Sequence, residues 1–174
     1  FYKFNGIELH LFSTKISKQN MKKVDISYKT HPNLPLIVAL NMSVSFPVLF
    51  EPVLYKKQMY IDGGILNNFP LNDCIDNVKD ENTILAFKNE WVDEDSSNSI
   101  VSIKDYIYYI VRACQSYISS DKNQKKIKQT VYCIVENMMN MDEWISTFKH
   151  KKHRYKLYKS GKSYARLYLN YQRQ

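Results

Sequence analysis

Two of the chain's four glycines stand together at Gly63 and Gly64, directly after an apolar run that ends in Asp62. This arrangement constrains the fold, because an aspartate at a strand end followed by glycines occupies a tight turn with an accessible side chain. Open α/β sheets place their active sites at such strand ends. The position therefore suits a catalytic base, which must be held rigidly. The alternative, on these three residues alone, is an ordinary Asp-Gly turn without chemistry.

Short strand-like segments alternate with helix-like ones along the chain. Residues 6–14 place Ile7, Leu9 and Leu11 on one face, which predicts a half-buried strand. Further strands are expected at 24–30, 48–55, 58–62, 83–87 and 130–135. The run at 83–87 is typical of a buried parallel strand, and 130–135 has the composition of another buried one. Gly63 and Gly64 are expected to adopt the permissive backbone that glycine allows.

Four helices are expected. The first opens at Pro35 and stops at Pro47, and the second runs from Pro70 through Val78. The third, residues 100–118, has the clearest helical spacing of apolar residues. The fourth is the stretch 142–171, in which Gly161 is a candidate break. In the third helix one face collects the residues Ile100, Ile103, Ile107, Ile110, Val111, Cys114, Tyr117 and Ile118. Strands alternating with helices predict an α/β fold.

Composition narrows the class of protein. With 174 residues and 44% hydrophobic content, the chain suits one folded domain and excludes wholesale disorder. No run reaches the roughly 18 apolar residues that span a bilayer, and no signal peptide is recognisable. Three widely spaced cysteines favour reduced thiols, and so a cytoplasmic location with contact at membrane surfaces as an option. No zinc or calcium ligand pattern is present.

The stretch from Ser43 to Pro70 resembles a segment of patatin-like phospholipases and calcium-independent phospholipases A2. In that family a helix ends in Ala-Ser-x-Ala-x-Pro, an aromatic residue and a proline follow, and a strand ends in Asp-Gly-Gly before Asn and Pro. The matching residues are, in order, Met42-Ser43-Val44-Ser45-Phe46-Pro47, Phe50, Pro52, Tyr60-Ile61-Asp62-Gly63-Gly64, Asn68 and Pro70. Met42 and Ser45 stand where the family has small residues. Ser45 is a mild change, whereas the bulkier Met42 puts the local packing in question.

The resemblance extends loosely over the remaining chain, through 6–14, 83–87 and the Gly161 to Ala165 stretch. It implies a partial patatin-like three-layer α/β/α domain with a mainly parallel sheet, of which residues 1–174 form the C-terminal part and 149–174 a basic helical tail. It also implies hydrolysis of acyl esters in glycerolipids or phospholipids by a serine–aspartate dyad. Asp62 takes the place of the dyad aspartate, supported by Gly63, Gly64, Asn68, Pro47 and Ser43. Neither a metal nor another cofactor is implied.

The nucleophile of that dyad is not found in these residues. It belongs in a Gly-x-Ser-x-Gly elbow, and no two of Gly6, Gly63, Gly64 and Gly161 are four apart. Ser43 and Ser45 are poor substitutes, because a helix end lacks the strained elbow. We therefore expect the serine and its glycine-rich loop to lie upstream, and the 174 residues alone to be nearly inactive. The alternative is a catalytically inactive fragment that binds a lipid membrane or a protein partner.

Positive charge gathers at the end of the chain. Residues 149–174 carry nine Lys or Arg and no acid, whereas the chain as a whole has a net charge of +8. One interpretation is that a basic cluster in this tail contacts anionic lipid. The cluster comprises Lys149, Lys151, Lys152, Arg154 and Lys156. A solvated helix whose tyrosines pack inward is the simpler reading. Nucleic-acid binding is the least favoured, since the chain has no RNA-binding signature.

Overall fold

The computed structural model describes residues 6–91, 102–119, 125–135 and 141–172. Residues 93–98, whose acids, serines and asparagine predict a solvated loop, lie outside them. The chain divides into two compact units. Unit 1 comprises Phe1–Phe69 with Ser102–Lys122, and unit 2 comprises Pro70–Val101 with Asn123–Gln174. That both belong to one domain, as the sequence suggests, stays a prediction.

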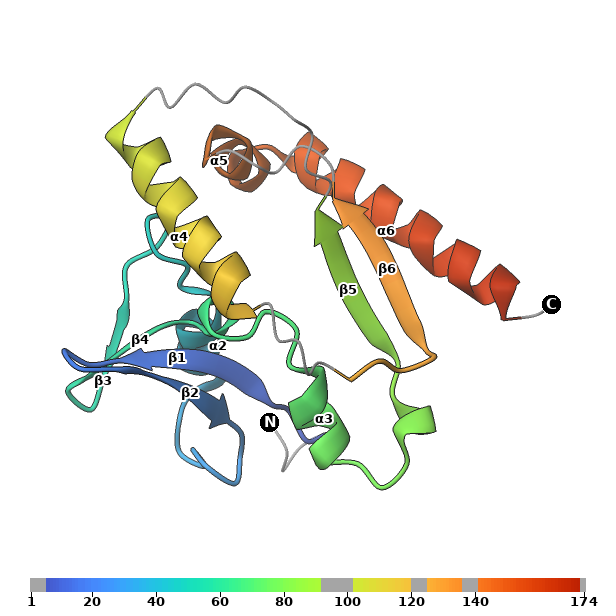
Figure 1. Ribbon diagram of the computed structural model, residues 1–174, viewed down its shortest axis with the longest axis horizontal. Coiled ribbons are helices and arrows are strands. Elements are labelled where there is room, and N and C mark those ends of the chain that lie inside the picture. The colour runs from blue at the N-terminus through green and yellow to red at the C-terminus, as the bar shows by residue number, and fades with distance from the viewer. Residues whose placement is uncertain (1–5, 92–101, 120–124, 136–140, 173–174) are drawn as a thin grey trace. The chain divides into compact units, whose positions relative to one another are not determined.

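Unit 1 is built on a four-stranded sheet in the order β2-β1-β4-β3 (Figure 1). Its strands are β1 (Leu11–Ile16), β2 (Met21–Ile26), β3 (Val53–Tyr55) and β4 (Gln58–Asp62). Every neighbouring pair is antiparallel. For β1–β2 and β3–β4 the cause is the shortness of their hairpin connections, since a parallel pair needs a crossover of a dozen or more residues.

One face of this sheet packs against helix α2 (Leu36–Val44). The helix starts after Pro35, whose carbonyl accepts from the amides of Val38 and Ala39. Ala39 and Met42 point from it into a buried cluster with Ile26 of β2 and Tyr60 of β4. Burying each large apolar side chain contributes about 1.5–3 kcal/mol. Met42 is fully buried, so this residue, questioned from the sequence, fills the core that the sheet and the helix share.

Two further elements complete unit 1. A 3-10 turn η1 (Gly63–Ile65) follows β4 directly, and helix α4 (Ile103–Ser119) contacts it. The stretch expected as a strand from 48 to 55 is extended only from Val53, because residues 47–49 form a turn in which Val48 has φ 76°. The strands of the first hairpin also differ from their predicted bounds of 6–14 and 24–30. Residues 6–10 are not a strand, and β2 starts at Met21 and ends at Ile26.

Unit 2 contains helix α3 (Leu71–Asp76), the 3-10 turn η2 (Glu81–Thr83), and the strands β5 (Ala86–Trp91) and β6 (Thr130–Val135). The two strands pair in parallel, from Ala86 opposite Thr130 to Trp91 opposite Val135. Helix α5 (Met141–Lys149) leads into α6 (Lys151–Tyr171), which contacts β6 (Figure 1). The helix break falls at His150 and not at Gly161, which lies inside α6.

The α/β class is confirmed, and so is a parallel strand near 83–87. Its predicted bounds and burial were wrong, because the strand runs from Ala86 to Trp91 and Phe87 is exposed. The mainly parallel sheet is a correction, since the larger sheet is wholly antiparallel. The prediction missed this because periodicity identifies strands without saying which of them are joined by hairpins.

Candidate active site

Asp62 is the last residue of β4 and is held there from both sides. Its Cα lies opposite Ser13 of β1 in the antiparallel ladder. Its backbone amide donates to the carbonyl of Ser45, just after α2, at 3.0 Å. The strand end is therefore attached to the sheet on one side and to the end of α2 on the other. This fixes the backbone from which the carboxylate projects, as a catalytic base requires.

The carboxylate of Asp62 is partly buried and accepts a hydrogen bond from the Gly64 amide at 2.6 Å. Burial raises the pKa of the Asp62 carboxyl above its ordinary value, and the Gly64 hydrogen bond opposes part of that rise. Removal from water disfavours the charged form, whereas an amide donor favours it. The result is a carboxylate with increased affinity for a proton and a fixed orientation. Such a group can accept a proton from a nearby hydroxyl.

The two glycines are needed for space and not for dihedral freedom. Neither has a positive φ, which corrects the expectation of a permissive backbone. A Cβ added to Gly63 would lie 2.3 Å from the carbonyl oxygen of Phe12 in β1. A Cβ on Gly64 would lie 2.7 Å from Asn68 Oδ1 and 2.9 Å from Asp62 Oδ1. Any larger residue would thus push the turn away from the sheet or displace the carboxylate.

Gln115 of α4 is a site residue that sequence reasoning missed. Its Nε2 donates to the Gly64 carbonyl at 2.9 Å, and its Oε1 accepts from Arg112 at 2.8 Å. The side chain is buried, although 51 residues separate it from Gly64. Gln115 therefore holds the carbonyl side of Gly64, the residue whose amide nitrogen binds the Asp62 carboxylate.

The face of α4 that packs in unit 1 is not the expected apolar one. Tyr108 and Gln115 are buried, and the Tyr108 ring lies 6.1 Å from that of Phe46. Ile103 and Tyr117, from the predicted face, are 70% and 85% exposed. The helix itself is confirmed. The spacing of Tyr108, Arg112 and Gln115 at i, i+4 and i+7 was the available signal, and the more numerous isoleucines concealed it.

The other predicted residues surround the turn less directly. Asn68 is exposed, with Oδ1 beside Gly64, whereas Asn67 Oδ1 accepts from the Phe69 amide at 3.1 Å and closes a local turn. Pro47 stands in the turn after α2, and Ser43 is half-buried on α2 itself. Their roles at the site stay predictions.

Ser13, the serine opposite Asp62 in the ladder, has a structural role. Ser13 Oγ lies 2.8 Å from the carbonyl oxygens of Met42 and of Ile61, which share its single hydroxyl proton, and the residue is fully buried. These bonds link β1, α2 and β4. A hydroxyl without solvent access and already paired is unsuited to attack a lipid ester.

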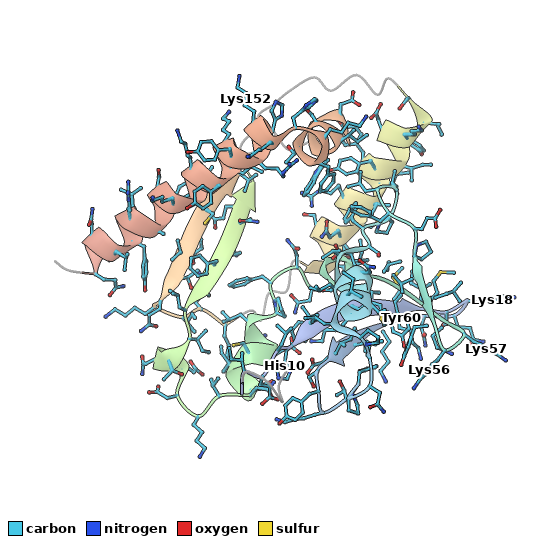
Figure 2. All side chains as sticks on the ribbon, turned by 180° about the vertical axis from the view of Figure 1, so that it is seen from behind. His10, Lys18, Lys56, Lys57, Tyr60 and Lys152 are labelled. Atoms are coloured by element: carbon cyan, nitrogen blue, oxygen red, sulfur yellow. The ribbon has the colours of Figure 1, made fainter. Side chains whose placement is uncertain are left out.

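A second cluster of titratable side chains lies at the surface, next to the start of β1. His10, labelled in Figure 2, contacts Asp25 at 2.8 Å and Glu8 at 3.0 Å, and Lys29 lies 2.7 Å from Glu8. Burial alone would lower the pKa of His10, but the hydrogen bonds and charges of Asp25 and Glu8 raise it overall. Such partly exposed pairs contribute little to stability. Within the described residues, no group of three His, Cys, Asp or Glu side chains could hold a metal ion.

The basic tail, residues 149–174, contains the last residue of α5 and the whole of α6. Arg154 donates to the carbonyls of Thr147 and Phe148 at the end of α5, so this charge caps a helix C-terminus. Lys151, Lys152 and Lys156 are exposed. Further along α6, Tyr164 donates to the Ile134 carbonyl of β6 at 3.2 Å. Among the described helices, none is long and apolar enough to cross a bilayer.

Comparison with known proteins gives a partial match. Residues 4–75 match the family model of patatin-like phospholipases. A probable lipid hydrolase of Invertebrate iridescent virus 6 is 37% identical over 71 residues, which cover 40% of this chain and 23% of that protein. An intracellular phospholipase A2 of Caenorhabditis elegans is 36% identical over 78 residues, 45% of this chain and 7% of its own length.

A third relative, protein R571 of Acanthamoeba polyphaga mimivirus, is 26% identical over 144 residues, covering 79% of this chain and 48% of that protein. The chain thus spans less than half the length of each of these relatives. No solved structure matches the chain.

Proposed function

We propose that this chain, of which residues 4–75 match the family model of patatin-like phospholipases, carries the base of a lipid acyl hydrolase, Asp62. The observation that supports the proposal is the fixed, partly buried carboxylate in the turn that Gly63 and Gly64 make possible. The names of two relatives, a lipid hydrolase and a phospholipase A2, support an ester of a glycerolipid or phospholipid as the substrate.

The proposed reaction is acyl transfer to a serine and then to water. Asp62 accepts the proton of the serine hydroxyl as its oxygen attacks the ester carbonyl, and the lipid alcohol leaves with that proton. Water then attacks the acyl-enzyme, with Asp62 again as the base, and a fatty acid is released. The serine and the donors for the oxyanion come from outside these 174 residues, which hold no Gly-x-Ser-x-Gly elbow.

The surroundings of Asp62 suit that role. A carboxylate that burial makes more basic accepts a proton more readily than one in water. The Gly64 amide occupies Oδ1, which leaves the second oxygen available. Gln115, through Gly64, holds the pair in this arrangement.

A second candidate function is a catalytically inactive patatin-like protein that binds lipid or a protein partner. The absence of the elbow within the 174 residues favours it. The two candidates differ in one respect: the hydrolase requires a serine from another part of the protein or from another chain.

The deciding experiment measures fatty acid release from phosphatidylcholine. We would express the chain alone and together with any in-frame sequence that precedes Phe1, and introduce Asp62→Asn into each. Where activity is found, Asp62→Asn should lower it by about 10²–10⁴-fold, because the amide retains the Gly64 bond but cannot take a proton.

Asp76→Asn, an exposed carboxylate on α3, is the matched control and should leave the rate unchanged. Full activity of Asp62→Asn would rule out its role as the base. Activity of the isolated chain would contradict a serine from outside it, and inactivity of every form would favour the binding protein.

A further inference from the structure

The two hairpin turns of unit 1 lie side by side at one end of its sheet. Ile16 is opposite Met21 in one hairpin and opposite Met59 of the other. The turns that follow these pairs, residues 17–20 and 56–57, therefore neighbour each other across the sheet. Figure 2 shows Lys18, Lys56 and Lys57 together at this end. We call the surface formed by residues 15–23 and 54–59 the hairpin tip.

The hairpin tip is strongly basic. Its six lysines are Lys15, Lys18, Lys22, Lys23, Lys56 and Lys57. No acidic residue occurs from 11 to 23 or from 53 to 61. Lys15 and Lys22 even stand directly opposite each other in the ladder, an arrangement that destabilises a sheet. An anionic partner would relieve this repulsion.

An exposed apolar row runs on the opposite face of the sheet from Lys15 and Lys22, directly before the turns that carry Lys18, Lys56 and Lys57. Met21, Ile16, Met59 and Leu54 lie opposite one another in turn across all four strands. Residues paired in this way share one face of the sheet. Leu54 is 72% exposed, Met21 51% and Met59 40%. Flexible apolar side chains thus reach the surface at the same end as the lysines.

The geometry of the turn at Lys56-Lys57 does not explain why lysines occupy it. Both residues have positive φ, 48° and 61°, in a two-residue hairpin turn. Such turns favour Asn-Gly, and a lysine in the left-handed region is unfavourable. Two adjacent lysines at the least suitable positions of the turn indicate that their charges have a use at this tip.

We propose that the hairpin tip docks onto an anionic lipid surface. Its lysines bind the headgroup phosphates while Met21, Met59 and Leu54 enter the boundary between headgroups and acyl chains. A nucleic acid is disfavoured as the partner, because single strands bind on exposed aromatic rings and the row is aliphatic. The proposal concerns binding and stands whether or not the parent protein hydrolyses lipid. It also differs from the tail prediction, since it places the contact in unit 1.

The test uses the 174-residue chain and sedimentation with vesicles of phosphatidylcholine, alone or mixed with phosphatidylserine in equal parts. The variant K56N/K57G removes two charges and supplies the favoured turn residues, so it should fold at least as well as the unaltered chain. Each lysine near the surface strengthens binding by about fivefold, so the variant should bind mixed vesicles about 30-fold more weakly. Binding of the unaltered chain should require phosphatidylserine and weaken with salt.

The matched control, K151Q/K152Q, removes the same charge from the exposed start of α6 and should bind within about fivefold of the unaltered chain. Equal losses in both variants would mean that only net charge matters, and would overturn the proposal. Unchanged binding of K56N/K57G would also overturn it. If that variant folds poorly, K18Q/K22Q at exposed hairpin positions replaces it, with the same expected loss.

Other occupants of the tip have their own signatures. Loss of homopolymeric RNA binding in K56N/K57G with intact vesicle binding would assign the tip to nucleic acid. Leu54→Gln should weaken vesicle binding even at high salt, because it removes an apolar and not a charged contact. A dimer that this substitution dissociates, with vesicle binding unchanged, would assign the row to a second copy of the chain.

Discussion

The Asp62 turn of unit 1 and helix α6 of unit 2 were both singled out from the sequence, yet they are fixed in opposite ways. The turn depends on Phe12, Ser45 and Gln115, three residues from three distant segments. Helix α6 has no fully buried residue, and its basic character comes from its own composition. The turn is therefore sensitive to small changes at distant positions, whereas α6 should tolerate most substitutions. Gly63 in the turn and Gly161 in α6 allow the sharpest test of this contrast.

The largest effect is expected from Gly63→Ala, compared with Gly161→Ala. The new methyl at 63 meets the Phe12 carbonyl, and since backbone atoms yield little, we expect a loss of about 3 kcal/mol of unfolding free energy. At 161 nothing lies within 4 Å and the residue is inside α6, so alanine should add about 1 kcal/mol. Urea unfolding with hydrogen exchange, read separately for each unit, measures both. Similar effects of the two substitutions would remove the contrast.

The next effect concerns the distant support of the turn. Gln115→Met keeps the size of the buried side chain but leaves the Gly64 carbonyl without its donor, which costs about 1–3 kcal/mol. Cys114→Ala, an exposed neighbour on α4, should change stability by less than about 0.5 kcal/mol. Thermal unfolding followed by circular dichroism compares them. If Gln115→Met matched its control, the Gly64 loop would not depend on α4.

The smallest expected effect is a pH-dependent difference in stability between Asp62→Asn and the unaltered chain. Burial raises the pKa of Asp62 in the folded state, so the charged form is disfavoured there at neutral pH. Asparagine removes this penalty, and the variant should unfold at a higher temperature at pH 7. The difference should shrink as the pH falls through the folded pKa of Asp62 and vanish once the carboxyl is protonated in both states. A variant less stable at pH 7 would show that the carboxylate stabilises the turn.

Sequence reasoning located most elements but not their pairing. Residues 58–62 and 130–135 were predicted with their observed bounds, because alternation and compact apolar runs are local signals. The strand expected at 48–55 was mostly wrong, because the positive φ of Val48 is a property of the turn that follows α2. The break in the last helix falls at His150, where Arg154 binds the exposed carbonyls of α5.

The sequence by itself determined that this chain is α/β, that its segment from Ser43 to Pro70 resembles patatin-like phospholipases, and that Asp62 ends a strand before two glycines. These facts follow from residue types at short spacing. Only the tertiary structure decided why the glycines are required, which side chain supports their turn, and that the lysines of two hairpins meet at one tip. Each of these depends on residues tens of positions apart, and the distance between such residues is set by strand register and helix packing, which no local pattern encodes.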